Sequence, residues 1–448
     1  MNKEILTKGF DELELGKDIK EKDDFILIDK DGVILEYRVI FTEKELLEYI
    51  DDHKGHTENR SGLLVTFECN NILGEFYNTI FLKKFRFDSY SNLKIDSHLR
   101  LILNNCEFVE DIELLGGDYK RIKINNCIIR NNMFVRFINC DKLRISETVV
   151  KESIIVENSE FGKFYGNASI FKENLLFQEV NILNDFILDK IKGEKELCFV
   201  DCRFEGLSKL ELDINGELSF LQCSFYKKSE INFDDIKGKF SLYKTNFSDK
   251  CYLEYELLEN KKYKPLIFDN DFKKTKWNFL IVSDIYKSSG RIDQYLETLY
   301  YFKKYERLER KSKNKNKGNF NLLYYLIGIT TKYYTSWERT LLSMVVVIVS
   351  FFLLYCFFPN LLMCKDVQLN SKNLFITVFE MLKNSNFDAN FLISKFGNTL
   401  YFTIITFTTV GYGDIIPLNW MKMAVSLESF LGVFFTSSFV VSLSRRFM

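Results

Sequence analysis

The seven residues TTVGYGD, at positions 408–414, stand between two strongly apolar segments and combine small, flexible and polar side chains. Gly411 and Gly413 alternate with Val410 and Tyr412. Glycine readily adopts positive φ values, so this alternation allows successive carbonyl oxygens to point to the same side of the chain. A column of such oxygens, repeated around an axis, can replace the water shell of a dehydrated cation. The segment is therefore a candidate cation site made of main-chain atoms.

The residues before this segment must position it. The sequence GNTLYFTIITF, at 397–407, predicts a short apolar helix that enters a lipid bilayer, after which residues 408–414 return to the side from which the helix came. A non-helical segment at membrane depth is tolerated only where it is buried in protein or lines a water-filled path. This arrangement predicts that 408–414 line such a path.

Two long apolar segments flank the candidate site. Residues 340–358 carry no charge, and 423–443 are apolar except for Glu428, so both are long enough to cross a bilayer. The alternative is a pair of buried helices in a large soluble protein. Trp337 and Trp420 precede the segments as interfacial anchors, and basic residues flank both outer ends. We therefore expect cytoplasmic N- and C-termini, an external 359–420 connection, and a place in the cell's plasma (inner) membrane.

The order of span, re-entrant helix, TTVGYGD and span resembles bacterial potassium channels with two transmembrane helices, over residues 336–448. The resemblance implies a homotetramer whose selectivity filter binds K⁺ on main-chain carbonyls, with the Thr409 hydroxyl forming the innermost site. The implied filter residues are Thr409, Val410, Gly411, Tyr412 and Gly413, supported by Thr408 and Asp414. In this family a pore-helix glutamate pairs with the aspartate that matches Asp414. Here Ile405 takes that place, so the pairing should be absent.

The second span contains two further candidate residues. Glu428 is either buried behind the filter and hydrogen-bonded to the pore helix, which is the structural role that we favour, or it faces the ion path. Gly432 lies on the same helical face as Glu428. It matches the family's hinge glycine, but glycine also serves close helix packing in membranes. Thr436, one turn further on, is a weaker candidate for lining the cavity.

The N-terminal part of the chain contains a repeat with a period near twenty residues. Apolar residues recur in one register at Phe87, Phe108, Ile129, Val150 and Phe171, and in a second at Ile182, Phe204, Phe225 and Phe247. Such a period predicts a β-solenoid whose coils stack these side chains in one core. Small Cys, Thr and Ser residues should fill its corners. Asparagine and aspartate should form turns and ladders, at Asn104, Asn105, Asn125, Asn126 and Asp201.

The repeat resembles a degenerate pentapeptide-repeat or related β-helical domain, although only one face keeps the motif. Open solenoid ends must be covered. We expect an N-terminal α/β cap over residues 1–61, with a hairpin near 23–41 and a helix capped by Thr42 and Glu45. The four predicted domains are the cap (1–61), the solenoid (62–262), a helical linker with an interfacial helix (263–335) and the pore (336–448).

The linker prediction rests on a helical pattern that breaks at Ser288-Ser289-Gly290, giving a helical hairpin, followed by an aromatic amphipathic segment near 319–337. The ten cysteines show no metal-ligand spacing and only three histidines accompany them, so we expect free thiols. The histidines, His53, His56 and His98, lie outside the repeated core positions and are expected at the surface.

These features predict a homotetrameric K⁺ channel whose cytoplasmic solenoid, through an unknown ligand or protein, controls opening. The alternative is a membrane-anchored solenoid scaffold for a protein partner, with little conduction. No phosphate loop, nucleophile motif or dinucleotide fingerprint is present, so an enzyme and an organic cofactor are not expected. With 61 basic and 62 acidic residues, the balance of charge gives no reason to expect nucleic-acid binding.

Overall fold

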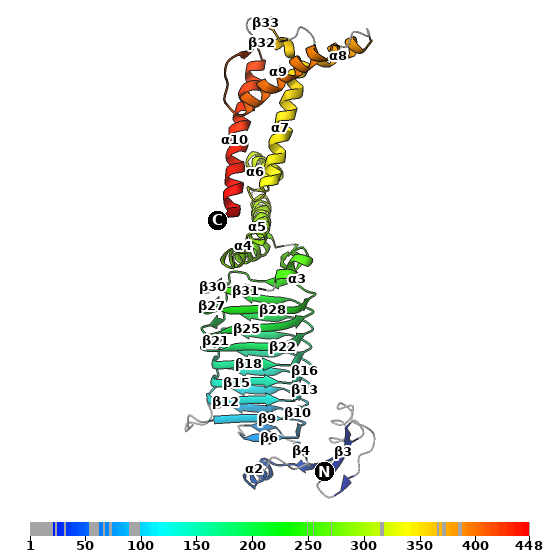
Figure 1. Ribbon diagram of the computed structural model, residues 1–448. Helices are drawn as coiled ribbons and strands as arrows, with labels where there is room; N and C mark the ends of the chain where they lie inside the picture. Colours follow the sequence, from blue (N-terminus) through cyan, green and yellow to red (C-terminus); the bar gives the residue numbers. More distant parts are fainter. Residues whose placement is uncertain are drawn as a thin grey trace. The chain divides into compact units, whose positions relative to one another are not determined.

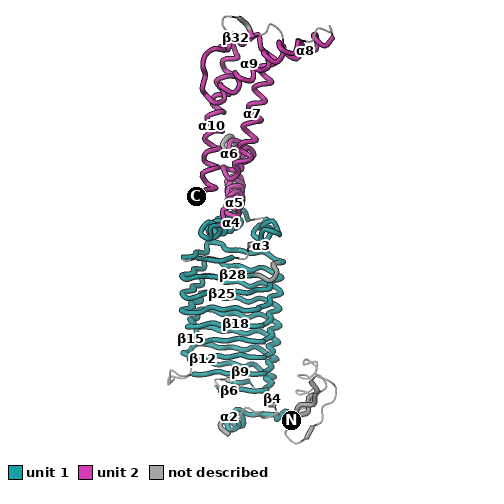
Figure 2. The backbone as a smooth tube through the Cα atoms, in the orientation of Figure 1, with its two compact units in different colours: residues 1–290 teal, residues 291–448 magenta. Residues whose placement is uncertain are grey.

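The computed structural model describes residues 21–22, 25–30, 33–52, 62–65, 68–70, 74–88, 99–248, 250–253, 255–269, 271–313, 318–364, 367–369, 373–383 and 388–447. The chain divides into two compact units, residues 1–290 and residues 291–448 (Figure 2). The three histidines considered above lie outside the described residues. The first unit is mainly β-structure and the second mainly helical.

The first unit is a β-solenoid whose coils stack as successive rungs (Figure 1). One side is a nine-stranded parallel sheet to which each coil contributes one short strand. From the N-terminal end its strands are β5 (Cys69–Asn70), β8 (Phe85–Asp88), β11 (Ile112–Leu115), β14 (Met133–Arg136), β17 (Ile154–Glu157), β20 (Leu175–Gln178), β23 (Leu197–Val200), β26 (Leu218–Leu221) and β29 (Phe240–Ser241). The predicted solenoid is therefore confirmed.

The remaining strands of each coil belong to a second, larger sheet. Its long strands are β9 (Leu99–Asn104), β12 (Asp118–Asn125), β15 (Asn139–Ser146), β18 (Glu160–Asn167), β22 (Phe186–Gly193), β25 (Ser208–Ile214) and β28 (Ser229–Ile236). Its short strands are β4 (Gly62–Val65), β6 (Glu75–Tyr77), β7 (Thr79–Phe81), β10 (Glu107–Phe108), β13 (Ile128–Ile129), β16 (Val149–Val150), β19 (Ile170–Phe171), β21 (Asn181–Ile182), β24 (Arg203–Phe204), β27 (Ser224–Phe225), β30 (Asn246–Phe247) and β31 (Cys251–Leu253).

The apolar side chains stack coil upon coil, as the period predicted. Phe108, Ile129, Val150 and Phe171 occupy matching positions on successive strands. The second register is also confirmed, from Ile182 to Phe247. A further aromatic column runs through Phe177, Phe199 and Phe220, whose ring centroids are 4.9 and 4.8 Å apart.

Two details of the predicted columns are wrong. Phe108 follows Phe81, not Phe87, because the chain between them takes 27 residues instead of 21; Phe87 instead pairs with Leu114 in the nine-stranded sheet. The second register also does not continue the first. Phe171 is followed by Gly193, whereas Ile182 follows Phe161, so the two registers are separate columns of the same solenoid.

Small polar residues form ladders at the corners of the coils. One ladder consists of four buried residues, one above another: Cys106, Cys127, Thr148 and Ser169. The backbone N–H of each of the first three donates a hydrogen bond to the side chain of the next residue in the ladder. Outside them, the Asn125 amide donates to Asn104 Oδ1 at 2.7 Å and Asn126 donates to Asn105 Oδ1 at 3.3 Å. Asn105, Asn126 and Asp201 have positive φ, as turn positions require. All ten cysteines are free, as expected.

At the N-terminal end, strands β2 (Phe25–Lys30) and β3 (Val33–Ile40) form the predicted antiparallel hairpin, with β1 (Glu21–Lys22) beside β2. Helix α2 (Glu43–Asp52) follows. Thr42 Oγ1 accepts from the N–H of Glu45, and the Glu45 carboxylate accepts from the N–H of Phe41. The capping pair is therefore confirmed, with its return bond one residue earlier than the standard box.

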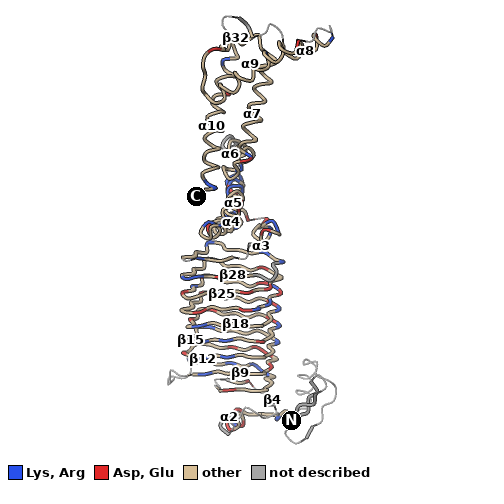
Figure 3. The backbone as a smooth tube through the Cα atoms, viewed as in Figure 1, with Lys and Arg blue, Asp and Glu red and all other residues tan. Residues whose placement is uncertain are grey.

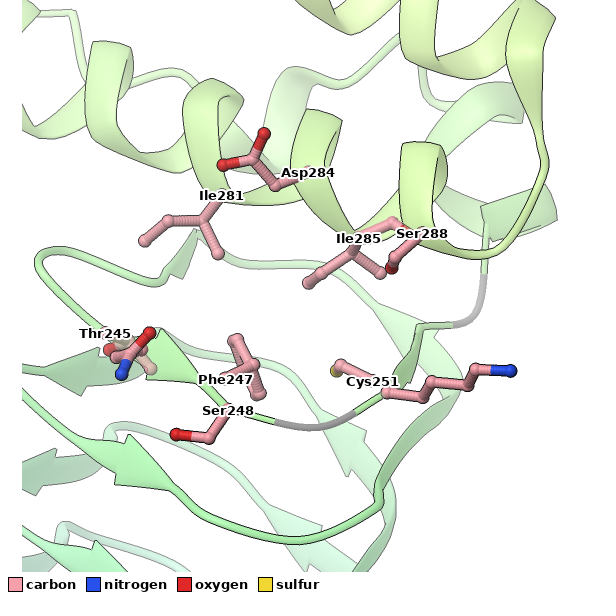
Figure 4. Close-up of a pocket in the computed structure, with 10 residues that line it drawn as sticks. Thr245, Phe247, Ser248, Cys251, Ile281, Asp284, Ile285 and Ser288 are labelled. Carbon is pink, nitrogen blue, oxygen red and sulfur yellow. The ribbon is translucent and has the colours of Figure 1, made fainter. Parts of the chain in front are cut away.

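At the other end of the solenoid lie α3 (Tyr255–Asn260), the short 3₁₀ helix η2 (Lys264–Leu266) and α4 (Phe272–Ser288). β29 is the last strand of the nine-stranded sheet, and α4 covers its outer edge with one buried side chain, that of Asn278. Asn278 accepts from the N–H of Leu242 at 2.9 Å and donates to the carbonyls of Phe240 and Leu266. A pocket of about 410 Å³ between this coil and α4 has an apolar wall of Phe247, Ile281 and Ile285 (Figure 4).

The second unit contains α5 (Ile292–Lys313), α6 (Gly318–Thr331), α7 (Trp337–Phe357), η3 (Pro359–Leu361), α8 (Leu374–Lys383), α9 (Ala389–Phe407) and α10 (Met421–Phe447). Strands β32 (Leu362–Cys364), β33 (Val367–Gln368) and β34 (Ile415–Pro417) form a small antiparallel sheet. α7 and α10 match the two predicted spans, and they are almost free of charge except near their ends (Figure 3). α4 ends and α5 begins around Gly290, where φ is +72° and the break was predicted.

Removing one ring from the aromatic column should destabilise the solenoid. Phe199 is fully buried between Phe177 and Phe220, so Phe199→Ala should lower the free energy of unfolding by about 3–5 kcal/mol. Urea unfolding followed by far-ultraviolet circular dichroism measures the change. Phe137→Ala is the matched control, because Phe137 is 52% exposed. Equal stabilities for the two variants would contradict the stacked core.

Candidate functional site

Helix α9 leads directly into the TTVGYGD segment. Its N-terminus is capped by Asp388, whose side chain accepts from the N–H groups of Asn390 and Phe391. The predicted helix over 397–407 is real but begins eight residues earlier, at Ala389, because this cap lies upstream of the apolar run. Its C-terminus is at Phe407, and Thr408 donates its N–H to the Ile404 carbonyl at 2.9 Å.

The main chain of the segment is fixed by bonds to the end of α9. The N–H of Thr409 donates to the Thr406 carbonyl, while those of Val410 and Gly411 both donate to the Ile405 carbonyl, at 2.9 and 3.2 Å. φ is +59° at Thr409, +53° at Gly411 and +78° at Gly413. The positive φ expected at both glycines is present, and Thr409 extends the alternation by one position.

The carbonyl oxygens of this segment remain available. Within the described part of the chain, no hydrogen-bond donor reaches the carbonyls of residues 409–413. Residues 408–414 are all exposed in the single chain, and Tyr412 is 72% exposed. Among the described residues no group of three His, Cys, Asp or Glu side chains could hold a metal ion. The segment therefore presents main-chain oxygens that a cation could bind.

A buried apolar cluster supports the segment from behind. It joins the two long helices, α9 and the small sheet, and consists of Tyr355, Leu362, Leu369, Phe402, Ile405, Ile415 and Met421. Ile405 thus has two roles: its side chain belongs to this cluster, and its carbonyl accepts the N–H groups of Val410 and Gly411. At the outer end of the segment, the Asp414 carboxylate interacts with Tyr401 of α9. Position 405 is an isoleucine and cannot pair with Asp414, but Tyr401 on the same helix provides a partner for this carboxylate.

Glu428 lies in the interior of the unit, fully buried on α10. It accepts a hydrogen bond of 2.5 Å from the Tyr355 hydroxyl of α7. Its other oxygen, Oε1, has no hydrogen-bond partner among the described residues. Glu428 is therefore buried, as one of the two alternatives expected. Its hydrogen-bond donor, however, is Tyr355 of α7 and not a residue of α9.

Gly432 and Thr436 follow Glu428 on α10. A Cβ at Gly432 would lie 1.9 Å from the Phe407 carbonyl oxygen, so α10 meets the end of α9 at a point that only glycine permits. This is the close-packing alternative for Gly432. Next to it, Ser429 donates to the Thr406 carbonyl at 3.3 Å. Thr436 is exposed in the single chain and donates to the Gly432 carbonyl at 2.7 Å.

A three-stranded sheet holds the chain where it leaves the TTVGYGD segment. β34 pairs with β32, with Met363 opposite Ile416. The N–H of Leu418 also donates to the Leu361 carbonyl at 2.8 Å. The sequence analysis did not predict this sheet, because strands of two or three residues carry too little apolar alternation to be recognised.

A second unpredicted feature joins the far end of α10 to the turn between α6 and α7. Lys332, Tyr333 and Tyr334 all have positive φ, which is costly for residues with a Cβ. Arg445 donates to the carbonyls of Tyr333 and Tyr334 at 3.2 and 3.4 Å. Arg446 makes exposed ion pairs with Asp293 and Glu338, both at 3.4 Å. We call residues 332–335 the elbow.

Two helices, Trp337–Phe357 and Met421–Phe447, are long and apolar enough to cross a membrane. Residues 371–448, which include α8, α9, the TTVGYGD segment and α10, match the family model described as ion channel. This part of the chain is an ion-channel domain. The two apolar helices, of which Met421–Phe447 lies within the matched residues and Trp337–Phe357 precedes them, fit a membrane protein. No curated protein and no solved structure significantly matches the chain.

The bond between Tyr355 and Glu428 should stabilise the ion-channel domain. Tyr355→Phe removes the one donor that the described residues offer to the buried carboxylate, which should cost about 1–3 kcal/mol. The thermal midpoint of the detergent-solubilised protein, followed by tryptophan fluorescence, should fall accordingly. Tyr325→Phe is a matched control because Tyr325 is exposed. If both variants melt together, the bond does not stabilise the domain.

Proposed function

We propose that the chain is a potassium-selective channel and that it acts as a homotetramer. The observation that carries this proposal is the filter segment itself, in which alternating φ values and anchored N–H groups leave the carbonyls of 409–413 without donors. One chain supplies a single column of such oxygens. Four columns around an axis would surround a dehydrated cation, and uncharged carbonyls suit K⁺ in known channels of this kind.

Each predicted residue has a role in this proposal. The carbonyls of Thr409, Val410, Gly411 and Tyr412 bind K⁺, and Gly413 completes the filter. Thr408 and Asp414 support it at its two ends, while Glu428 supports it indirectly by joining α10 to α7. Gly432 allows α10 to approach α9 and is the proposed hinge. Thr436, one turn further along α10, lines the cavity.

The proposed topology places α7 and α10 across the plasma membrane with both termini in the cytoplasm. The basic residues that precede α7, and Arg445 and Arg446 at the end of α10, favour this orientation. α6 has exposed Leu322, Leu323 and Leu326, which suits a helix lying on the inner surface of the membrane. We also propose that the domain boundaries follow residues 61, 262 and 335, and that the solenoid is of the pentapeptide-repeat type.

The solenoid is proposed to control opening through residues 266–335. These residues include α4, which is bound to the last coil, and the elbow, which is bound to the end of α10. A ligand or protein that binds the solenoid would act through this connection if it bound the open and closed forms with different affinity. The elbow is the contact through which such a bias would reach α10.

Ion flux from liposomes that contain the purified full-length protein tests conduction and selectivity. We expect K⁺ flux to exceed Na⁺ flux and to be blocked by barium. Gly411→Ala forces a residue with a Cβ to φ +53°, which costs about 1–2 kcal/mol, so the K⁺/Na⁺ flux ratio should fall about tenfold.

Gly397→Ala is the matched control for that substitution. Neither glycine has an atom within 4 Å of an added Cβ, but only Gly411 has positive φ. Equal Na⁺ and K⁺ fluxes in the parent protein would contradict potassium selectivity. Absence of any flux from an intact tetramer, with and without residues 1–290, would instead favour a membrane-anchored scaffold.

Control by the solenoid is tested by deleting residues 1–290, which removes the whole first unit. A cut at 262 would leave the buried face of α4, including Phe279 and Val282, without its coil. We expect a changed open probability in planar bilayers, with the tetramer still present by native mass spectrometry. Unchanged open probability would contradict control by the solenoid.

Arg445→Gln in the full-length chain tests the elbow separately. It should change the open probability more than Arg446→Gln, because Arg445 binds main-chain carbonyls whereas the ion pairs of Arg446 are exposed and contribute about 0–1 kcal/mol. Equal effects of the two substitutions would show that the elbow bond does not carry the signal.

A further inference from the structure

A lysine-rich pocket lies at the C-terminal end of the solenoid, formed by the turn before β29 and by the segment from the end of α3 to η2. Its volume is about 590 Å³, within the usual range for small-molecule sites. The described residues that line it are Lys237, Gly238, Lys239, Asn260, Lys261, Lys262, Lys264 and Pro265. Five of these eight are lysines and none is acidic. We call it the lysine pocket.

Three of its ammonium groups are unpaired. Within the described part of the chain, Lys237, Lys262 and Lys264 make no ion pair or hydrogen bond through their side chains. Lys239 is held at the wall, since its Nζ donates to the Ile267 carbonyl at 2.5 Å and lies over the Phe268 ring. Elsewhere on the solenoid, lysines commonly pair with carboxylates, as Lys163 does with Asp185 at 2.9 Å. Three neighbouring lysines without a partner among the described residues therefore distinguish this pocket.

Both walls of the lysine pocket are held by the backbone. A Cβ at Gly238 would lie 1.6 Å from the Gly216 carbonyl, so the turn that carries Lys237 and Lys239 is pressed against the preceding coil. On the other wall, Lys262 and Tyr263 have φ of +50° and +57°. The Tyr263 ring is 1% exposed and packs against Phe279. Strained backbone of this kind persists only where its surroundings enforce it.

We propose that the lysine pocket binds a multiply charged anion that carries two or more phosphate groups. Bringing like charges together in a concave site is unfavourable until an anion neutralises them. Lysine binds phosphate as a point charge, and several lysines at different places around the cavity match a ligand with several phosphates better than a single small anion. The ligand is either a soluble polyphosphate compound or the phosphorylated headgroup of a lipid. The pocket of Figure 4 does not offer this chemistry, because it contains both Asp284 and Lys250.

This site lies at the point where the chain leaves the solenoid for α4. An occupant would contact both the last coil and η2, whose Leu266 carbonyl bonds to Asn278 of α4. If the proposed gating is correct, this is where a cytoplasmic phosphate compound would act. The binding site itself does not depend on conduction, and its test below measures binding alone.

The test uses full-length protein in nanodiscs of neutral phosphatidylcholine, with sodium tripolyphosphate as the soluble probe in isothermal titration calorimetry. A second arm measures co-sedimentation of the detergent-solubilised protein with phosphatidylcholine vesicles that contain phosphatidylinositol bisphosphate. We expect saturable binding in at least one arm, weakened at least about tenfold by Lys262→Gln with Lys264→Gln. Since the site is open to solvent, added salt should also weaken binding.

Two matched double variants make the result specific. Lys120→Gln with Lys172→Gln removes two exposed lysines elsewhere on the solenoid and should leave binding unchanged. Lys262→Arg with Lys264→Arg keeps the charge and should retain binding, which separates loss of charge from loss of folding. Binding in the tripolyphosphate arm alone identifies a soluble ligand, and binding in the vesicle arm alone identifies a lipid headgroup. No saturable binding in either arm, or equal loss in the pocket and control variants, overturns the proposal.

Discussion

Main-chain hydrogen bonding is the constraint on which both units of this protein depend. In the solenoid, ladders of main-chain hydrogen bonds join each coil to the next, and the end coils have no further coil with which to bond. Asn278 resolves this at the C-terminal end by donating to and accepting from the last strand. The filter segment is the opposite case. The N–H groups of residues 408–411 are bonded to the end of α9, while the carbonyls of residues 409–413 have no donor within the described chain. Those oxygens are free to bind a cation.

The need of these carbonyls for a partner also indicates that more than one chain forms the site. Residues 408–414 are exposed in one chain, and so are large apolar side chains of α10 such as Leu427 and Phe430. A channel of this kind needs several carbonyl columns around one ion, which further copies of the chain would supply. The hydrocarbon chains of lipid would cover some of the apolar surface of α10. They carry no positive charge, however, so they could not take the place of a cation at the carbonyls of residues 409–413. The proposed tetramer therefore follows from the chemistry of the ion more than from the area of apolar surface.

Most of the fold could be predicted from the sequence because its signals are local or periodic. The 21-residue spacing from Phe108 to Phe171 predicted adjacent coils, and the glycines at 411 and 413 predicted positive φ. The placement of Phe87 failed because one coil is longer, and a fixed period cannot show where a coil lengthens. The bond from Tyr355 to Glu428 joins residues 73 apart, and that from Arg445 to the elbow spans more than a hundred. Neither leaves any pattern in the sequence.

These long-range bonds explain how α10 is held. Toward the filter, Glu428 binds Tyr355; in the middle, Gly432 meets the Phe407 carbonyl; at the far end, Arg445 binds the elbow. Ile405 belongs to the apolar cluster, so residues 408–414 are backed by apolar packing, while Glu428 joins the two long helices. The first two contacts are buried. Under the proposed topology, an opening movement that bends α10 at Gly432 would keep the outer bond to Tyr355 and displace the cytoplasmic end. The elbow would then have to move with that end or release Arg445, and either outcome couples the opening of the pore to residues 332–335.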